Sequence, residues 1–157
     1  MDGADKRALR RWLPVAVIVA AWAASLPLPA LAVRGGPTLT GWEMLLQGWQ
    51  GAGRGVYAWY ANPLFAVAVV AAVANRPRAA LVASGFSILL ALTTFVAEDV
   101  LHRSMERVPE LTLLVGFYVW VAALLAAFLS AWRTVYLQLR DNLRPRAGGR
   151  KSFHFWD

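Results

Sequence analysis

The chain has 157 residues, 59% of them hydrophobic, and a formal net charge of +7. It contains no cysteine, which excludes disulfides, thiolate metal sites, iron–sulfur clusters and c-type haem. Four uncharged stretches each approach the roughly 20 apolar residues that a helix needs to cross a bilayer, where it satisfies its own backbone groups. We therefore expect an all-α integral membrane bundle of four transmembrane helices in residues 1–144, followed by a tail in residues 145–157. No cofactor is expected.

The first expected span covers residues 12–33 and follows a basic N-terminal stretch. Pro27 and Pro29 are expected to kink or end the helix near its outer end, because proline lacks a backbone N–H. A competing interpretation is a secretory signal, since the basic start, the apolar run and the small residues Ala30 and Ala32 resemble one with its cleavage site. The apolar run is longer than a usual signal core, which favours a retained span.

A short extracytoplasmic helix is expected over residues 41–50, between the first two spans. Thr40 and Glu43 have the spacing of a capping box. Four large apolar residues then recur at i, i+3, i+4 and i+7 and share one helical face: Trp42, Leu45, Leu46 and Trp49. This face either lies on the membrane surface or packs onto the bundle as a lid.

The second span is expected over residues 56–75 and is interrupted by a proline. Asn62 and Pro63 have the order of an N-cap and a first helical residue. Residues 63–75 would form only about 20 Å of helix, which is short of a roughly 30 Å hydrocarbon core. Either the helix begins near Val56 and bends at Pro63, or it starts at Pro63 beneath an aromatic cap containing Trp59.

The third and fourth spans are expected over residues 79–98 and 111–133. The turn at residues 75–78 predicts that the second and third spans form an antiparallel hairpin. Three sets of small residues recur at every fourth position and indicate plausible faces for close helix contact. They are Ala16, Ala20 and Ala24; Ala122, Ala126 and Ser130; and Ala123, Ala127 and Ala131.

The basic residues indicate an orientation in the membrane. Twelve of the 16 lysines and arginines precede the first span, lie between the second and third, or follow the fourth. The other four are Arg34, Arg54, Arg103 and Arg107. This bias places both termini in the cytoplasm, because positive charge accumulates on that side.

Residues 98–110 are the one place where catalytic or metal-ligating residue types gather. The candidate ligands are Glu98, Asp99, His102 and Glu106, at spacings that align on a helix. The same spacings are typical of a solvated helix end with ion pairs between residues four apart. We expect no metal site and no catalytic residue, although a metal-dependent enzyme remains an alternative.

The tail combines a basic cluster with large aromatic residues. Its candidate contact residues are Arg144, Arg146, Arg150, Lys151, Phe153, Phe155 and Trp156. Basic clusters beside a span bind anionic lipid of the inner leaflet, and aromatic side chains suit either the membrane or a groove on a protein partner. Nucleic acid is not an expected partner, because the inner leaflet already explains the positive charge.

Several motifs resemble a group of small bacterial multi-pass membrane proteins to which no activity is assigned. The motifs are Gly41-Trp42-Glu43 with Leu45, Leu46, Gly48 and Trp49; Trp59 with Ala61-Asn62-Pro63; and Gly116-Phe117-Tyr118-Val119-Trp120. The resemblance implies a multi-pass topology in a bacterial inner membrane and no particular function.

Residues 12–33, 55–75, 79–97 and 111–132 contain no charged side chain, whereas transporters, pumps and proton channels usually carry ionisable groups at depth. We therefore expect a non-catalytic accessory, scaffolding or assembly subunit that contacts lipid or protein partners in the membrane. Outside the tail, the expected contact residues are Trp42, Leu45, Leu46, Trp49, Trp59, Asn62 and Pro63. The alternative is a small transporter or channel for a neutral or amphiphilic solute, lined by Asn62-Pro63, Ser84, Ser87, Thr93 and Thr94.

Overall fold

The computed structural model describes residues 3–96 and 111–143. These residues are mostly helical, as expected, and they also form a small three-stranded sheet that the sequence did not predict. The helices are α1 (Gly3–Ser25), α2 (Gly41–Gln47), α3 (Ala61–Val73), α4 (Pro77–Leu92) and α6 (Val115–Leu143), with short 3₁₀ helices η1 (Gly48–Arg54), η2 (Ala58–Tyr60) and η3 (Thr93–Val96). The strands are β1 (Pro29–Val33), β2 (Thr38–Thr40) and β3 (Leu111–Leu113).

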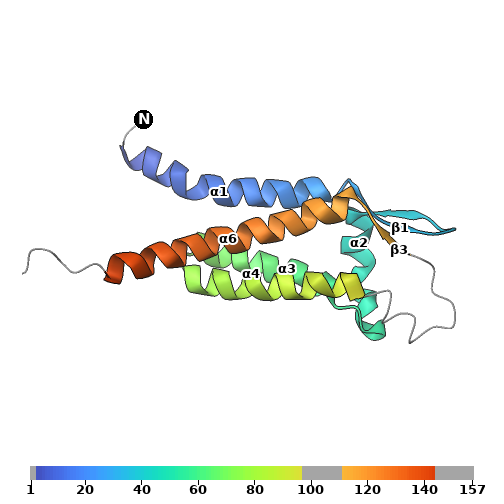
Figure 1. Ribbon diagram of the computed structural model, residues 1–157. Coiled ribbons are helices and arrows are strands. Elements are labelled where there is room, and N and C mark those ends of the chain that lie inside the picture. The colour runs from blue at the N-terminus through green and yellow to red at the C-terminus, as the bar shows by residue number, and fades with distance from the viewer. Residues whose placement is uncertain (1–2, 97–110, 144–157) are drawn as a thin grey trace, which may run out of the picture.

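The four long helices lie side by side, with different structures at the two ends of the bundle (Figure 1). One end of the bundle, which we call the basic end, contains the N-terminal end of α1, the turn between α3 and α4, and the C-terminal end of α6. The strands and α2 lie at the opposite end. We call residues 26–60 and 111–114 the cap.

The bundle core is built from a few large side chains between many alanines. Ile18, Phe65 and Leu124 are buried together with Ala61 and Ala91, and Trp22 and Trp120 pack against them. Of the expected small-residue faces, the one that is buried includes Ala123 and Ala131 of α6. Small side chains let helix backbones approach closely.

The other two expected small-residue faces are not packed within the described bundle. Ala122 and Ala126 are exposed, and so are Ala16, Ala20 and Ala24. A span rich in alanine presents such spacings on several faces, and the positions of the larger side chains determine which face is buried. In α1, Ile18, Trp22 and Ser25 face the bundle at i, i+4 and i+7.

The first expected span, residues 12–33, is wrong at its outer end. Helix α1 ends at Ser25, and Pro29–Val33 forms strand β1 instead. Pro27 and Pro29 cannot donate helical hydrogen bonds, so they end the helix as expected. The chain then turns into the middle strand of the sheet β2-β1-β3.

The fourth expected span, residues 111–133, is shifted in the same way. Leu111–Leu113 pairs antiparallel with β1, with Leu31 opposite Leu113 and Val33 opposite Leu111. Helix α6 then runs from Val115 to Leu143, ten residues beyond the expected end. A short apolar strand next to an apolar helix has no periodicity of its own that would mark the boundary.

The region around Pro63 follows neither expected alternative. Helix α3 begins at Ala61 after the single 3₁₀ turn η2, so Pro63 is its third residue and Tyr60 is the N-cap. The backbone N–H that proline lacks has no helical partner in a first turn, so Pro63 is tolerated at this position. The expected N-cap role of Asn62 is therefore wrong.

The hairpin of the second and third spans is confirmed. Asn75 adopts a left-handed conformation (φ 60°) in the turn, and Pro77 is the first residue of α4. The third expected span, 79–98, begins two residues early in the structure, and its last two residues lie outside the described ranges.

Two helices in the described residues are long and apolar enough to cross a membrane, namely Pro77–Phe95 and Val115–Leu143. The apolar segments Trp12–Ser25 and Ala58–Val73 are shorter. Length and composition thus identify two membrane-spanning candidates among the four expected spans.

Candidate functional site

The side-chain amide of Asn62 connects three helices where the bundle meets the cap. The indole Nε1 of Trp22, on α1, donates to Asn62 Oδ1 at 3.1 Å, and Nε1 of Trp120, on α6, donates to the same oxygen at 2.9 Å. Asn62 Nδ2 donates to the backbone oxygen of Trp59 at 3.1 Å. We call Asn62, Trp22, Trp120 and Trp59 the Asn62 cluster.

The chemistry of the partners fixes the orientation of this amide. An indole nitrogen can only donate a hydrogen bond, and a backbone oxygen can only accept one. The amide oxygen must therefore face the two indoles, and the amide nitrogen must face Trp59. An asparagine placed to satisfy three groups from different elements specifies how those elements meet.

A hydroxyl-to-backbone hydrogen bond joins α4 to the same place. The Ser87 hydroxyl donates to the backbone oxygen of Ala61 at 2.8 Å, and both residues are 0% exposed. The start of α3 is thus held from α4 as well as from α1 and α6.

Helix α2 is held within the cap at its start and near its end. The backbone N–H of Gly41 donates to Leu28 at 3.0 Å, and that of Trp42 donates to Leu26 at 2.8 Å. These N–H groups belong to the first helical turn and have no partner within the helix. Near the end of α2, the Leu45 backbone oxygen accepts a hydrogen bond from Trp59 Nε1 at 2.6 Å.

The expected capping box is confirmed. The Glu43 carboxylate accepts from the Thr40 backbone N–H at 2.7 Å and from its hydroxyl at 2.9 Å. The Glu43 N–H in turn donates to the Thr40 hydroxyl oxygen at 3.3 Å. The backbone N–H of Thr40, followed by its hydroxyl, lowers the pKa of the Glu43 carboxyl below its usual value of 4.5.

This lowered pKa predicts a pH-dependent component of cap stability. The carboxyl binds its proton less readily when folded, so its contribution is present above pH 4.5 and is lost as the pH falls through the lower folded-state pKa. Thermal unfolding of the purified chain between pH 7 and pH 3 measures this loss. In the Glu43→Gln variant the side chain does not titrate. The difference in unfolding temperature between the unaltered chain and this variant should therefore shrink in acid. Parallel curves over the whole range would show that the carboxylate contributes nothing.

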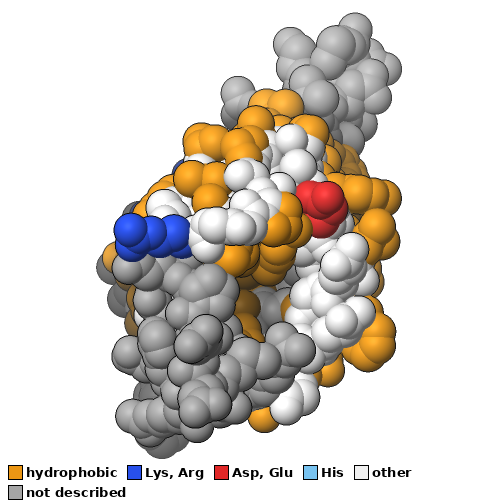
Figure 2. All heavy atoms as spheres, turned by 90° about the vertical axis from the view of Figure 1, so that its right-hand side faces the viewer, with side chains coloured by type: hydrophobic (Ala, Val, Ile, Leu, Met, Phe, Trp, Pro, Cys, Tyr) orange, Lys and Arg blue, Asp and Glu red, His pale blue; other side chains and the backbone are white. Residues whose placement is uncertain are grey.

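A cavity of about 460 Å³ lies between the cap and the ends of the bundle helices. Its walls come from β1, β2, β3, α2 and η1 on the cap side, and from Asn62, Phe117 and Trp120 on the bundle side. Apolar side chains form most of the lining. Figure 2 shows this end of the molecule, where hydrophobic side chains are prominent on the described surface.

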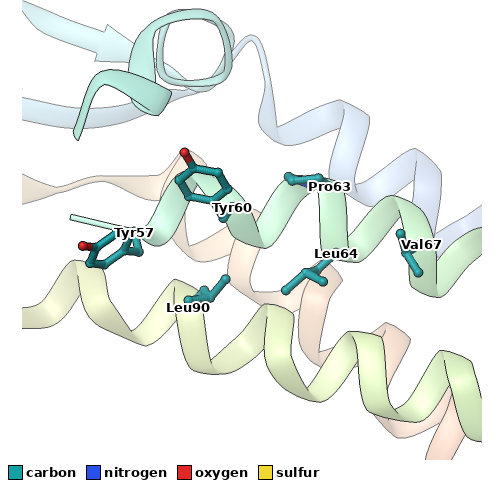
Figure 3. A pocket seen from close by; sticks show the side chains of 6 residues that line it. All are labelled: Tyr57, Tyr60, Pro63, Leu64, Val67 and Leu90. Carbon is teal, nitrogen blue, oxygen red and sulfur yellow. The ribbon is translucent and has the colours of Figure 1, made fainter. Parts of the chain in front are cut away.

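A second, more open groove of about 480 Å³ follows the outside of α3. Figure 3 shows Tyr57 and Tyr60 at its cap end, Pro63, Leu64 and Val67 along α3, and Leu90 reaching across from α4. This lining is almost wholly apolar. The groove is therefore an apolar surface formed mainly by α3 and the facing side of α4.

The expected apolar face of the 41–50 segment is divided by the structure. Trp42, Leu46 and Trp49 are 52%, 56% and 55% exposed, whereas Leu45 is half-buried and lines the cap cavity. Helix α2 ends at Gln47, and Trp49 belongs to η1. One edge of this segment therefore lines the cavity, while Trp42, Leu46 and Trp49 form an exposed aromatic edge.

The hydroxyls proposed to line a transport path are bonded to the backbone. Ser84 donates to the oxygen of Ala80 at 2.7 Å, and Thr93 donates to that of Leu90 at 2.6 Å. Ser87 donates to the backbone oxygen of Ala61, as described above. Thr94 differs from these three in lining the cap cavity.

The remaining candidates lie outside the described residues. These are the metal candidates Glu98, Asp99, His102 and Glu106, and the tail residues Arg144, Arg146, Arg150, Lys151, Phe153, Phe155 and Trp156. Within residues 3–96 and 111–143, no group of three or more metal-ligating side chains is found.

Three glycines that the sequence did not assign a role are points of close backbone approach. A Cβ on Gly116 would lie 2.8 Å from the backbone oxygens of Leu28 and Pro29, and one on Gly41 would lie 2.6 Å from that of Ser25. A Cβ on Gly48 would lie 2.8 Å from Cδ1 of Trp59. Gly41 and Gly116 allow α2 and α6 to touch the chain at and just after the end of α1, and Gly48 makes room for the Trp59 ring.

Comparisons with protein-family models, with curated proteins and with solved structures found no match.

Proposed function

We propose that this chain is a non-catalytic integral membrane protein of a bacterial inner membrane. In this proposal its four long helices are embedded in the bilayer, both termini are cytoplasmic and the cap lies on the outer side. It acts there as an accessory, scaffolding or assembly subunit of a membrane complex.

The exposure of large apolar side chains supports the membrane placement. Only 28% of each of the two span windows is buried within the protein, whereas the core helix of a soluble domain would be mostly buried. Val70, Leu89 and Leu129, on three different helices, are among the exposed side chains. Monomeric soluble proteins rarely expose contiguous apolar patches of this extent.

The observation that carries the subunit role is the exposed aromatic edge of Trp42, Leu46 and Trp49. The capping box, the Leu26 and Leu28 backbone contacts and the Trp59 indole hold this edge in place. Tryptophan is enriched among the residues that dominate protein interfaces, and a preorganised surface loses less entropy on binding. An aromatic edge that is exposed and held in place by these hydrogen bonds fits a surface that docks against another membrane protein.

Site-specific photo-cross-linking tests this role. A benzophenone amino acid replaces Trp49 in one variant and Trp132 in the control, because Trp132 is equally exposed (56%) but lies on α6. We expect a protein adduct of discrete mass from position 49 that is absent from position 132 and is lost when Trp42→Ser is added. Adducts with lipid alone at position 49 would contradict the subunit role and would identify the edge as a membrane anchor.

A further inference from the structure

The cap cavity has the size and chemistry of a small-molecule site. Ligand pockets commonly enclose about 300–1,000 Å³ and combine an apolar lining with a few polar groups, and this cavity of about 460 Å³ falls within that range. Leu31 and Leu39 of the sheet and Phe117 of α6 are among its apolar lining residues.

The polar side chains on its walls include the amides of Asn62, Gln47 and Gln50 and the hydroxyls of Ser25 and Thr94. Asn62 lines the cavity, and its amide nitrogen carries two hydrogens, of which one is donated to Trp59. Gln47 and Gln50 also line the cavity and are exposed, and their side chains make no hydrogen bond to another described residue. Primary amides both donate and accept, which suits a hydroxyl, ester or amide head group.

Among the described lining residues, Glu43 is the one ionisable side chain. The backbone N–H and hydroxyl of Thr40 hold it as a carboxylate. A fixed negative charge disfavours an anionic head group in a cavity of low polarity. It does not oppose a neutral one.

We propose that the cap cavity binds a neutral amphiphile, with a hydrocarbon body against the leucines and Phe117 and an uncharged hydroxyl or ester head at the amides. This proposal rests on the membrane placement proposed above, since the cavity adjoins the ends of the bundle helices and a membrane-derived ligand would enter from the adjacent leaflet. It adds a ligand to the proposed subunit role and does not depend on the partner of the aromatic edge.

A photoreactive long-chain alcohol with a diazirine in its alkyl chain tests the site in the full-length protein in lipid nanodiscs. We expect saturable labelling of residues that line the cavity, with competition by unlabelled alcohol. The Ala58→Phe variant fills the cavity from η2, and Leu39→Phe fills it from β2, so each should reduce labelling about tenfold or more, a factor equivalent to about 1.4 kcal/mol of binding free energy. Ala66→Phe is the matched control, because Ala66 is exposed on α3, and its labelling should equal that of the unaltered chain.

Two results would overturn the proposal. Labelling confined to exposed side chains of α3 and α4, or equal in the filled variants and the control, would show that the cavity holds no ligand. Equal competition by the fatty carboxylate of the same chain length would contradict the neutral class. Two filling variants from different walls, each checked for an intact unfolding transition, separate loss of binding from loss of folding. If topology mapping places the cap on the outer side but the alcohol does not label the cavity, the ligand proposal is wrong and the membrane placement still holds.

Discussion

Replacing Asn62 by leucine is expected to destabilise the protein by about 2 kcal/mol, because three hydrogen bonds between elements are lost at about 0.6 kcal/mol each for an average bond between membrane helices. The Trp22 and Trp120 indoles would lose their acceptor, and the Trp59 backbone oxygen would lose its donor. Unfolding in a graded denaturing detergent, followed by tryptophan fluorescence, measures the change. Asn142→Leu, at an exposed position near the end of α6, is the matched control and should change stability little.

Energetic coupling within the Asn62 cluster is tested by also removing the two indole donors that Asn62→Leu leaves without an acceptor. Leaving a buried donor without a partner costs more than replacing both partners by apolar groups. Trp22→Phe and Trp120→Phe should therefore lower the free energy of unfolding less in the Asn62→Leu variant than in the unaltered chain. Strictly additive effects would show that the three residues are not energetically coupled.

Gly116→Ala and Gly85→Ala are expected to change stability in opposite directions, although both add one methyl group to a helix. The Gly116 Cβ would meet two backbone oxygens at 2.8 Å, so β1 and α6 must separate, and such overpacking costs about 1–3 kcal/mol. The Gly85 Cβ would meet Phe128 at 3.6 Å, an ordinary contact distance. Alanine in a helix interior is favoured over glycine by about 0.5–1 kcal/mol, so Gly85→Ala should stabilise.

The same unfolding measurement compares the two variants. Gly41→Ala gives an independent check, because its Cβ would lie 2.6 Å from the Ser25 backbone oxygen. Equal effects of Gly116→Ala and Gly85→Ala would mean that the cap does not sit tightly on α6.

The sequence predicted the helices of the bundle better than it predicted the cap. Charge-free runs located all four long helices, and the Thr40–Glu43 spacing predicted the capping box that starts α2. The strands were missed because Pro29–Val33 and Leu111–Leu113 continue apolar runs, and pairing between segments about 80 residues apart leaves no local pattern. Pro27 and Pro29 were the local signal that the first helix had to end.

The candidate site was found in part. Asn62, Pro63 and Trp59 were singled out, but local capping chemistry assigned Asn62 to the backbone of its own helix. Its oxygen instead accepts from indoles 40 residues before and 58 residues after it in the chain. Such tertiary partners cannot be read from spacing. Gly41, Gly48 and Gly116 were the remaining local signals of the cap contacts, because glycine amid bulky apolar residues often marks close approach of the backbone to another group.

If the bundle is embedded in a membrane with the cap outside and the basic end in the cytoplasm, only the cap is accessible from outside the intact cell. The chain contains no cysteine, so single cysteines report on topology without background. Gly53→Cys probes the cap, where an added Cβ meets nothing within 4 Å, and Ala74→Cys probes an exposed position at the basic end. In intact spheroplasts, a membrane-impermeant maleimide should label Gly53→Cys, and should label Ala74→Cys only after permeabilisation. Labelling of both positions in intact spheroplasts, or the reverse pattern, would contradict the account.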